Sequence, residues 1–289
     1  MMETPIGRLE VSVDGVGPAA VLMHSLFVDS RSWDRVRGRL ASERTLVAIT
    51  APGHGPSGDP GRTYSIHEIA AAALGILDGL AAEKRIPPGP ADWVGNALGG
   101  HAGILAAAHY PERIRSLITL GAPVQAPTLP FRLQEAAILP ARALMGMTGW
   151  LRQAIVSVLL SERTRAHDPE AVGYVEECLT ASDPRLLGRA IRSLAVRRPD
   201  FTGLLPRITA PTVFATGTEH NSWPPELAAE AARLLPHGTA VTLPHAAYLL
   251  PLEVPEETAQ LILRHWSAAE ARPEGIHTST QDAGSGTDS

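Results

Sequence analysis

The residues of this 289-residue chain best suited to chemistry are its eleven histidines and its single cysteine, Cys178. Histidine and cysteine bind zinc, and zinc sites place them at short, fixed spacings. No two histidines stand four residues apart beside an acid in the HExxH manner, and a lone cysteine forms neither a CxxC pair nor an internal disulfide. We therefore expect no metal and no cofactor.

Strand and helix patterns alternate along most of the chain. Ser65 and Glu68 form a capping box that opens an alanine-rich helix. A strand at 92–94 leads into a helix at 98–109, and the same alternation returns between 211 and 266. Such alternation predicts an α/β fold in which helices cover both faces of a mostly parallel sheet.

The N-terminal segment predicts a hairpin. Residues 8–13 alternate in strand fashion and end at Asp14 and Gly15, a dipeptide typical of tight hairpin turns. Because a short apolar run follows at 19–23, we expect these two strands to pair with each other.

The strand signal disappears between Pro123 and about Pro206, where helical patterns take over. We interpret residues 124–206 as a helical cap inserted into a core made of residues 1–123 and 207–271. Residues 272–289 are small and polar, which predicts a disordered tail.

Five segments resemble the motifs of the α/β-hydrolase superfamily, in the same order. They resemble its oxyanion loop, its Pro-Gly-His-Gly-x-Ser loop, its nucleophile elbow, its acid strand and its histidine loop. The resemblance covers nearly the whole chain outside the cap and implies an α/β-hydrolase fold. The segments are VLMHSLFVDSRSW (21–33), APGHGPSG (51–58), DWVGNALGGHAGI (92–104), PTVFATGTEH (211–220) and LPHAAYLLPLEVPEE (243–257).

The resemblance places three unusual residues where the superfamily has its catalytic triad. Ala97 stands at the nucleophile position, His220 at the position of the acid and Tyr248 at that of the histidine. A methyl group cannot attack a carbonyl, so we expect no acyl-enzyme to form. The glycines of the elbow are retained, and the resemblance implies that its tight turn is retained too.

Neighbouring residues offer other ways to rebuild the site. Glu219 and His245 could replace the acid and the base after a loop shift, although a side chain one position off at a strand end tends to point the other way. Ser25 and Ser30 could supply a hydroxyl. Ser25 more simply replaces a glycine of the oxyanion loop, and Ser30 is typical of a helix N-cap.

Main-chain donors do not depend on the lost side chains. The resemblance implies that an oxyanion hole is formed by the N–H groups of Leu98 and Leu26, which can stabilise an enolate or alkoxide. It also places His220 and Tyr248 side by side. One interpretation is that Tyr248 exchanges a proton with substrate while His220 tunes it, and the other is that both residues fill the space of a decayed triad.

An apolar pocket is the expected surrounding of this site. Met145 and Trp150 in the cap, and Trp223 beside His220, suggest apolar lining, although each is more simply explained as a core residue. His24 and Ser25 lie on the expected oxyanion loop, where His24 either supports the loop or touches substrate.

The amino-acid composition limits the classes of partner that we expect. The formal net charge of −5 gives no reason to bind nucleic acid or an anionic membrane, so we expect a small apolar carbonyl compound as substrate. The chain shows no basic start followed by an apolar run and no apolar stretch of about 20 residues, which predicts a cytoplasmic protein without a signal peptide or membrane span. The oligomeric state stays open.

Three functions remain on these grounds. The first is a non-hydrolytic enzyme that performs proton transfer, cyclisation, elimination or carbon–carbon cleavage in specialised metabolism. The second is a hydrolase in which bound water attacks an ester or lactone directly. The third is a catalytically inactive binding protein that keeps the pocket as a receptor, since one fold can host many functions.

Overall fold

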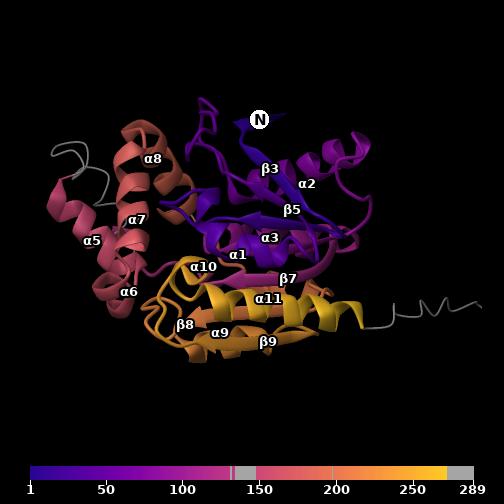
Figure 1. Ribbon diagram of the computed structural model, residues 1–289. Coiled ribbons are helices and arrows are strands. Elements are labelled where there is room, and N and C mark those ends of the chain that lie inside the picture. Colours follow the sequence, from indigo (N-terminus) through magenta and orange to yellow (C-terminus); the bar gives the residue numbers. More distant parts are fainter. Residues whose placement is uncertain (131, 134–147, 197, 272–289) are drawn as a thin grey trace, which may run out of the picture.

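The computed structural model describes residues 1–130, 132–133, 148–196 and 198–271. Figure 1 shows a twisted sheet with helices packed on both faces, and helices α5 to α8, called the cap helices or the cap below, gathered at one end of it. Met145 and the tail predicted at 272–289 lie outside the described residues.

One sheet of seven strands has the order β3-β5-β4-β6-β7-β8-β9. Strand β3 is antiparallel to β5, and every other neighbouring pair is parallel. The mostly parallel sheet predicted from the sequence is confirmed. The strands are β3 (Val11–Gly15), β4 (Ala19–Met23), β5 (Thr45–Ile49), β6 (Ala91–Asn96), β7 (Ile114–Leu120), β8 (Thr212–Gly217) and β9 (Gly238–Leu243), with a separate pair β1 (Met2–Thr4) and β2 (Gly7–Leu9).

Helices cover both faces of this sheet. Side chains of α2, α3 and α9 share one core cluster with the strands, whereas those of α1 and α11 share the other. No described helix is long and apolar enough to cross a membrane. The core helices are α1 (Asp34–Leu40), α2 (Ile66–Ala82), α3 (Leu98–His109), α9 (Pro225–Ala232), α10 (Leu250–Glu253) and α11 (Pro255–Glu270), with short 3-10 helices η1 (Ser30–Trp33) and η2 (Pro111–Arg113).

Local sequence signals fix the helix starts. The Ser65 side chain accepts from the Glu68 N–H, and the Glu68 carboxylate accepts from the Ser65 N–H, so the predicted capping box is confirmed. These bonds satisfy donors that a helix leaves free in its first turn.

The predicted hairpin is wrong. Strand β3 pairs with β5, and β4 lies between β5 and β6 with all five of its residues buried. The turn at Gly15 packs against the end of α1, where Val16 N–H donates to Ala41 O at 3.2 Å. A strand buried on both faces gains more from two parallel neighbours than from an edge hairpin, so tertiary packing overrides the turn signal.

Between β7 and β8, the described residues form helices and loops and no strand. The helices are α5 (Gly149–Leu159), α6 (Glu162–His167), α7 (Pro169–Ala181), α8 (Pro184–Ala190), a π-helix η3 (Ile191–Val196) and a 3-10 helix η4 (Thr202–Arg207). The boundary of the cap at 124–206 stays a prediction.

Candidate active site

A one-residue turn joins β6 to α3. Ala97 has φ 44° and ψ −100°, a backbone conformation that residues other than glycine rarely adopt. Its N–H donates to Leu120 O at 2.8 Å. Glycine is required on either side, because a Cβ on Gly95 would lie 2.1 Å from Gly99 C and one on Gly99 would lie 2.1 Å from Met23 O. The tight elbow is therefore present, with a methyl group at its tip.

The first amide of α3 points out of the helix. Leu98 is the first residue of α3, so its N–H has no acceptor within the helix and lies at the positive end of the helix dipole. The next amide, Gly99 N–H, donates to His24 O at 3.1 Å and ties the helix start to the loop that carries Leu26. Phe27 in that loop has φ 75°. The elbow and the loop predicted to form an oxyanion hole are thus in direct contact.

His24 supports this loop with both ring nitrogens. Its Nδ1 donates to Ser25 O at 2.7 Å, and its Nε2 accepts from Ala51 N–H at 2.8 Å. Burial, together with the neighbouring His54, lowers the pKa of His24 to about 3, so the ring is neutral. Ser25 is also buried. Neither ring nitrogen of His24 is available to a substrate in this arrangement.

His220 and Tyr248 stack on each other. His220 follows β8, Tyr248 follows β9, and their ring centroids lie 3.6 Å apart with an angle of 27° between the planes. The His220 Nε2–H donates to Gly121 O at 3.3 Å, which leaves Nδ1 with a lone pair. Burial lowers the pKa of His220 to about 4, so this histidine is also neutral near pH 7.

The Tyr248 phenol lies between two polar neighbours that the sequence analysis missed. Its O–H donates to Asn221 Oδ1 at 2.6 Å, and Ser222 Oγ lies 2.8 Å from the phenol oxygen. Asn96, directly before Ala97, donates from Nδ2 to the Tyr248 carbonyl at 2.7 Å. Asn96 therefore links the elbow to the loop of Tyr248, and its place beside the nucleophile position was the only available signal.

Glu219 and His245, considered above as replacements for the acid and the base, form hydrogen bonds with the start of α6 instead. Glu219 is exposed, and its Oε2 accepts from Glu162 N–H at the start of α6 at 2.8 Å. His245 is exposed as well, with φ 60°, and its carbonyl accepts from Ser161 Oγ at 3.0 Å. A loop shift would break these bonds, so the described geometry does not favour a conventional acid and base here.

Comparison with known proteins decides the family. A model described as the alpha/beta hydrolase family matches residues 20–261. The chain belongs to this family. The fold assignment made from the sequence is therefore confirmed.

Individual relatives of this α/β-hydrolase are named as hydrolases. Pyrrolizixenacetamide deacetylase of Xenorhabdus hominickii is 27% identical over 285 residues, which cover 94% of this chain and 100% of that protein. An esterase from Thermogutta terrifontis superposes with a TM-score of 0.82 at 23% identity over 90% of this chain and 93% of the other. The enol-lactonase of Burkholderia xenovorans gives 0.79 at 20% identity over 90% and 96%. These names support an enzyme of the α/β-hydrolase class.

A buried carboxylate, also missed, shapes the Tyr248 loop of this α/β-hydrolase. Glu253 accepts from the N–H groups of Ala247 at 2.9 Å and Leu249 at 3.1 Å, and from Ser161 N–H at 2.6 Å. Burial raises the pKa of Glu253, while these three donors oppose that shift. Glu253 therefore holds the two residues that flank Tyr248 and ties them to the cap.

The predicted apolar lining is only partly brought to the site. Trp223 is fully buried and packs edge-on against Phe214 at 6.3 Å between ring centroids, while its main-chain N–H donates to His220 O at 3.4 Å. Trp150 on α5 is 69% exposed. The structure places Trp223 next to His220 and leaves Trp150 on the outside of the cap.

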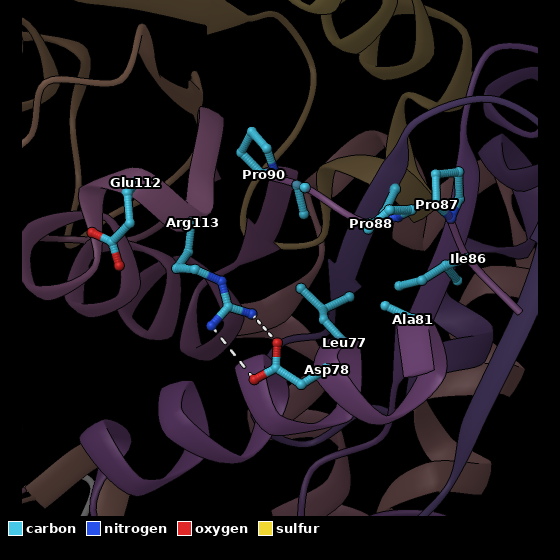
Figure 2. Close-up of a pocket in the computed structure, with 12 residues that line it drawn as sticks. Leu77, Asp78, Ala81, Ile86, Pro87, Pro88, Pro90, Glu112 and Arg113 are labelled. Carbon is cyan, nitrogen blue, oxygen red and sulfur yellow. Dashed lines mark hydrogen bonds and ion pairs between the residues drawn. The ribbon is translucent and has the colours of Figure 1, made fainter. Parts of the chain in front are cut away.

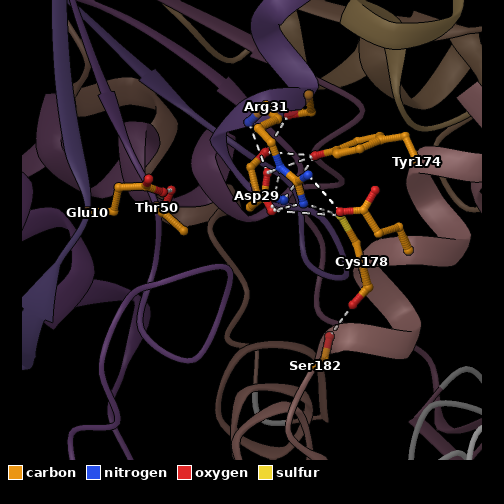
Figure 3. A network of polar contacts seen from close by, with 9 residues as sticks. Glu10, Asp29, Arg31, Thr50, Tyr174, Cys178 and Ser182 are labelled. Atoms are coloured by element: carbon orange, nitrogen blue, oxygen red, sulfur yellow. Dashed lines mark hydrogen bonds and ion pairs between the residues drawn. The ribbon is translucent and has the colours of Figure 1, made fainter.

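A polar network fastens the cap directly behind the oxyanion loop. Figure 3 shows Tyr174 and Cys178 of α7 pointing toward Asp29 and Arg31 of the core. Asp29 accepts from Arg31 Nη2 at 2.9 Å, from Tyr174 O–H at 3.1 Å and from Cys178 Sγ at 3.8 Å. Asp29 is also the N-cap residue of η1, so the helix N-cap expected at Ser30 lies one residue earlier. The Asp29 carboxylate, a stronger hydrogen-bond acceptor than the Ser30 hydroxyl, caps this helix.

A cavity of about 270 Å³ lies at the opposite end of the sheet. It is bordered by Ala19 and Ala91, the first residues of β4 and β6, whereas the elbow follows the last residue of β6. Arg113 and Asp78, which both line it, form an ion pair (Figure 2). This cavity is separate from the candidate active site.

Proposed function

We propose that this α/β-hydrolase is a small-molecule enzyme that holds the carbonyl oxygen of an apolar substrate at backbone N–H groups and works without an acyl-enzyme. The reaction class is non-hydrolytic: proton transfer, cyclisation, elimination or carbon–carbon cleavage. One observation carries the proposal, namely that the elbow keeps its φ of 44° around a residue, Ala97, that cannot act as a nucleophile.

Backbone strain at Ala97 has a cost. A non-glycine residue in a sparsely populated conformation costs on the order of 1–3 kcal/mol, and such strain clusters at functional sites. The strained turn fixes the direction of the Leu98 N–H, because α3 begins directly after Ala97 and a relaxed turn would change the orientation of its first amide. A fixed donor aimed at a developing oxyanion is worth on the order of 3 kcal/mol in a dry site. The retained geometry therefore supports stabilisation of an enolate or alkoxide.

Tyr248 is the proposed proton carrier. Because Asn221 Oδ1 can only accept, the phenol donates to it, and Ser222 Oγ–H in turn donates to the phenol oxygen. This chain of donors can stabilise the oxygen on either side of a proton transfer. His220 stacks on the ring and is neutral, so in this proposal it fixes the position of the phenol and leaves its charge unchanged.

The test uses a metabolite extract of the source cells, incubated with the wild type and with Tyr248→Phe and followed by mass spectrometry. We expect a compound that keeps its mass and changes its retention, or one that loses a neutral fragment, and we expect this conversion to fall at least tenfold in Tyr248→Phe. Tyr110→Phe, at the far end of α3, serves as the matched control and should convert normally. Unchanged turnover in Tyr248→Phe would remove the proposed role.

A second measurement addresses the missing nucleophile. Treatment with an activated ester or a fluorophosphonate should leave the mass of the intact protein unchanged, because no hydroxyl stands at the elbow. A covalent adduct on any side chain lining the site would overturn the proposal.

Direct hydrolysis is the second candidate, favoured by the deacetylase at 27% identity. Water held at the oxyanion donors would need a base, and His220 Nδ1 is buried with no hydrogen-bond partner among the described residues. A product heavier than its precursor by one water, or two fragments that together contain one added water, would identify this reaction in the same experiment.

A further inference from the structure

Arg198 is a buried cation near the end of the chain's return to the core. It lies just after η3, where the chain returns from the cap to the core, and it is only 8% exposed. Of its nitrogens, Nη1 donates to Pro123 O, and neither Nε nor Nη2 bonds to a described residue. No described carboxylate forms an ion pair with it. A guanidinium carries five N–H donors in a fork, so most of this group is unused.

The histidine beside Arg198 does not neutralise it. His101 Nε2 lies 2.9 Å from Pro123 O and 3.4 Å from Arg198 Nη1. Because a carbonyl oxygen can only accept, Nε2 must carry a proton, and its approach to Nη1 is one of donor to donor. Burial and the charge of Arg198 hold the pKa of His101 well below its usual value, so this ring is neutral.

The carboxylate of Asp200 acts on Arg198 without forming an ion pair with it. Burial lowers the pKa of Arg198 to about 10. Asp200 has the next largest effect and raises this pKa, Arg132 lowers it, and Tyr248 raises it. The Asp200 oxygens already accept from Ala126 N–H at 3.0 Å and from Thr202 N–H at 2.8 Å. Buried charges in proteins are generally paired, and an uncompensated one is costly to keep.

The position of Arg198 relative to the elbow points to substrate. His101 lies one turn along α3 from Ala97, to whose carbonyl its N–H donates at 2.9 Å. Pro123 follows Leu120, the last residue of β7, which holds the Ala97 N–H. Arg198 therefore stands over the carboxyl ends of β6 and β7, the edge of the sheet where α/β proteins bind their ligands.

We propose that Arg198 binds a carboxylate of the substrate, which makes the substrate an organic acid with an apolar body. The fork of Nε and Nη2 matches a carboxylate in bidentate geometry. This inference rests on the proposed function only in placing the reacting carbonyl at Ala97, and it adds an anionic end to the apolar carbonyl compound proposed there.

The test measures binding and needs no turnover. Acetate, phenylacetate and 4-phenylbutanoate are titrated by calorimetry against the corresponding neutral amides. The wild type should bind at least one carboxylate ten times more tightly than its amide, and Arg198→Gln should reduce that preference to within twofold. Arg192→Gln removes an exposed arginine of the same segment and should retain the full preference.

Unfolding curves separate a binding role from a structural one. Arg198→Gln should leave the midpoint of thermal unfolding of the ligand-free protein unchanged or raise it, because it removes a buried charge that forms no ion pair with a described residue. A lowered midpoint would indicate a structural role. If Arg198→Gln does not fold, Arg198→Lys keeps the charge without the fork and should show an intermediate preference.

Several results would overturn the inference: no preference for any carboxylate in the wild type, no binding of any of them, or a preference that survives in Arg198→Gln. Tyr248→Phe should keep the carboxylate preference while losing conversion. A wild type that prefers carboxylates through Arg198 but converts nothing would sustain this inference and reject the proposed function.

Discussion

The elbow around Ala97 and the pair formed by His220 and Tyr248 are held in place in different ways. The elbow is fixed by close main-chain contacts, and the residue at its tip carries only a methyl group. The pair is fixed by ring stacking and by side-chain hydrogen bonds of the Tyr248 phenol. Main-chain contacts hold a geometry whatever side chain stands at its centre, whereas an arrangement held by side chains changes when they are replaced.

The largest expected effect breaks the elbow itself. In Gly95→Ala the new methyl would lie 2.1 Å from Gly99 C and 2.3 Å from Gly100 N, both main-chain atoms that cannot move aside alone. We expect a loss of about 4 kcal/mol or more in the free energy of unfolding, or no folded protein. Urea unfolding followed by circular dichroism measures this loss.

Gly75→Ala is the matched control for this substitution. Gly75 lies within α2, and a methyl there meets nothing within 4 Å. The control should gain about 0.5–1 kcal/mol from helix propensity. A Gly95→Ala protein as stable as the wild type would show that the elbow is not held by backbone contacts.

The second prediction concerns pH, since both regions bury neutral histidines. Folding lowers the pKa of His24 to about 3 and that of His220 to about 4, and it also lowers the pKa values of His54 and His101. The unfolded chain therefore binds more protons, so stability is fully present above about pH 6.5 and is lost as the pH falls toward 4. His24 and His220 each contribute about 1.4 kcal/mol per pH unit within that window, and His54 and His101 act in the same direction.

Single substitutions divide this effect between the two regions. His220→Phe keeps a ring to stack on Tyr248 and should flatten the pH dependence by one histidine, with a small change at pH 8. His24→Phe also removes one titration, but it leaves Ser25 O and Ala51 N–H unpaired. It should therefore cost about 2 kcal/mol or more at pH 8. Equal losses of unfolding free energy at pH 8 in the two variants would contradict the view that main-chain contacts hold the elbow and its loop whereas side chains hold the His220–Tyr248 pair.

Local signals predicted much of this fold and less of its site. The helix over 98–109 has the bounds expected from the sequence, because its start and end are marked by residues within a few positions. The hairpin at Gly15 failed because the partner of β3 is β5, which lies thirty residues away in the chain and is selected by burial. Pairing that depends on the whole sheet is not encoded in a turn.

The residues of the candidate site also divide into those that local sequence signals predict and those that only the packed structure brings together. Ala97, His220 and Tyr248 sit in recognisable motifs, so their positions could be expected. Arg198 belongs to no motif, and the role proposed for it rests on its burial and on the lack of an ion pair with any described carboxylate, which only the packed structure reveals. Asn221 and Ser222 were passed over for a related reason, because their contacts with Tyr248 join two loops.

The smallest expected effect tests the strain at Ala97 alone. Ala97→Gly removes a methyl from a residue at φ 44°, which relieves strain on the order of 1–3 kcal/mol. Glycine also adds backbone entropy to the unfolded chain, which costs about 0.5–1 kcal/mol. The net expectation is a gain of about 1 kcal/mol in the free energy of unfolding. Ala71→Gly, at an exposed position in α2, should instead lose about 1 kcal/mol. Opposite signs for the two substitutions in urea unfolding would show that the elbow holds Ala97 in a strained conformation, whereas equal losses would mean that the turn is relaxed and that its geometry needs no functional explanation.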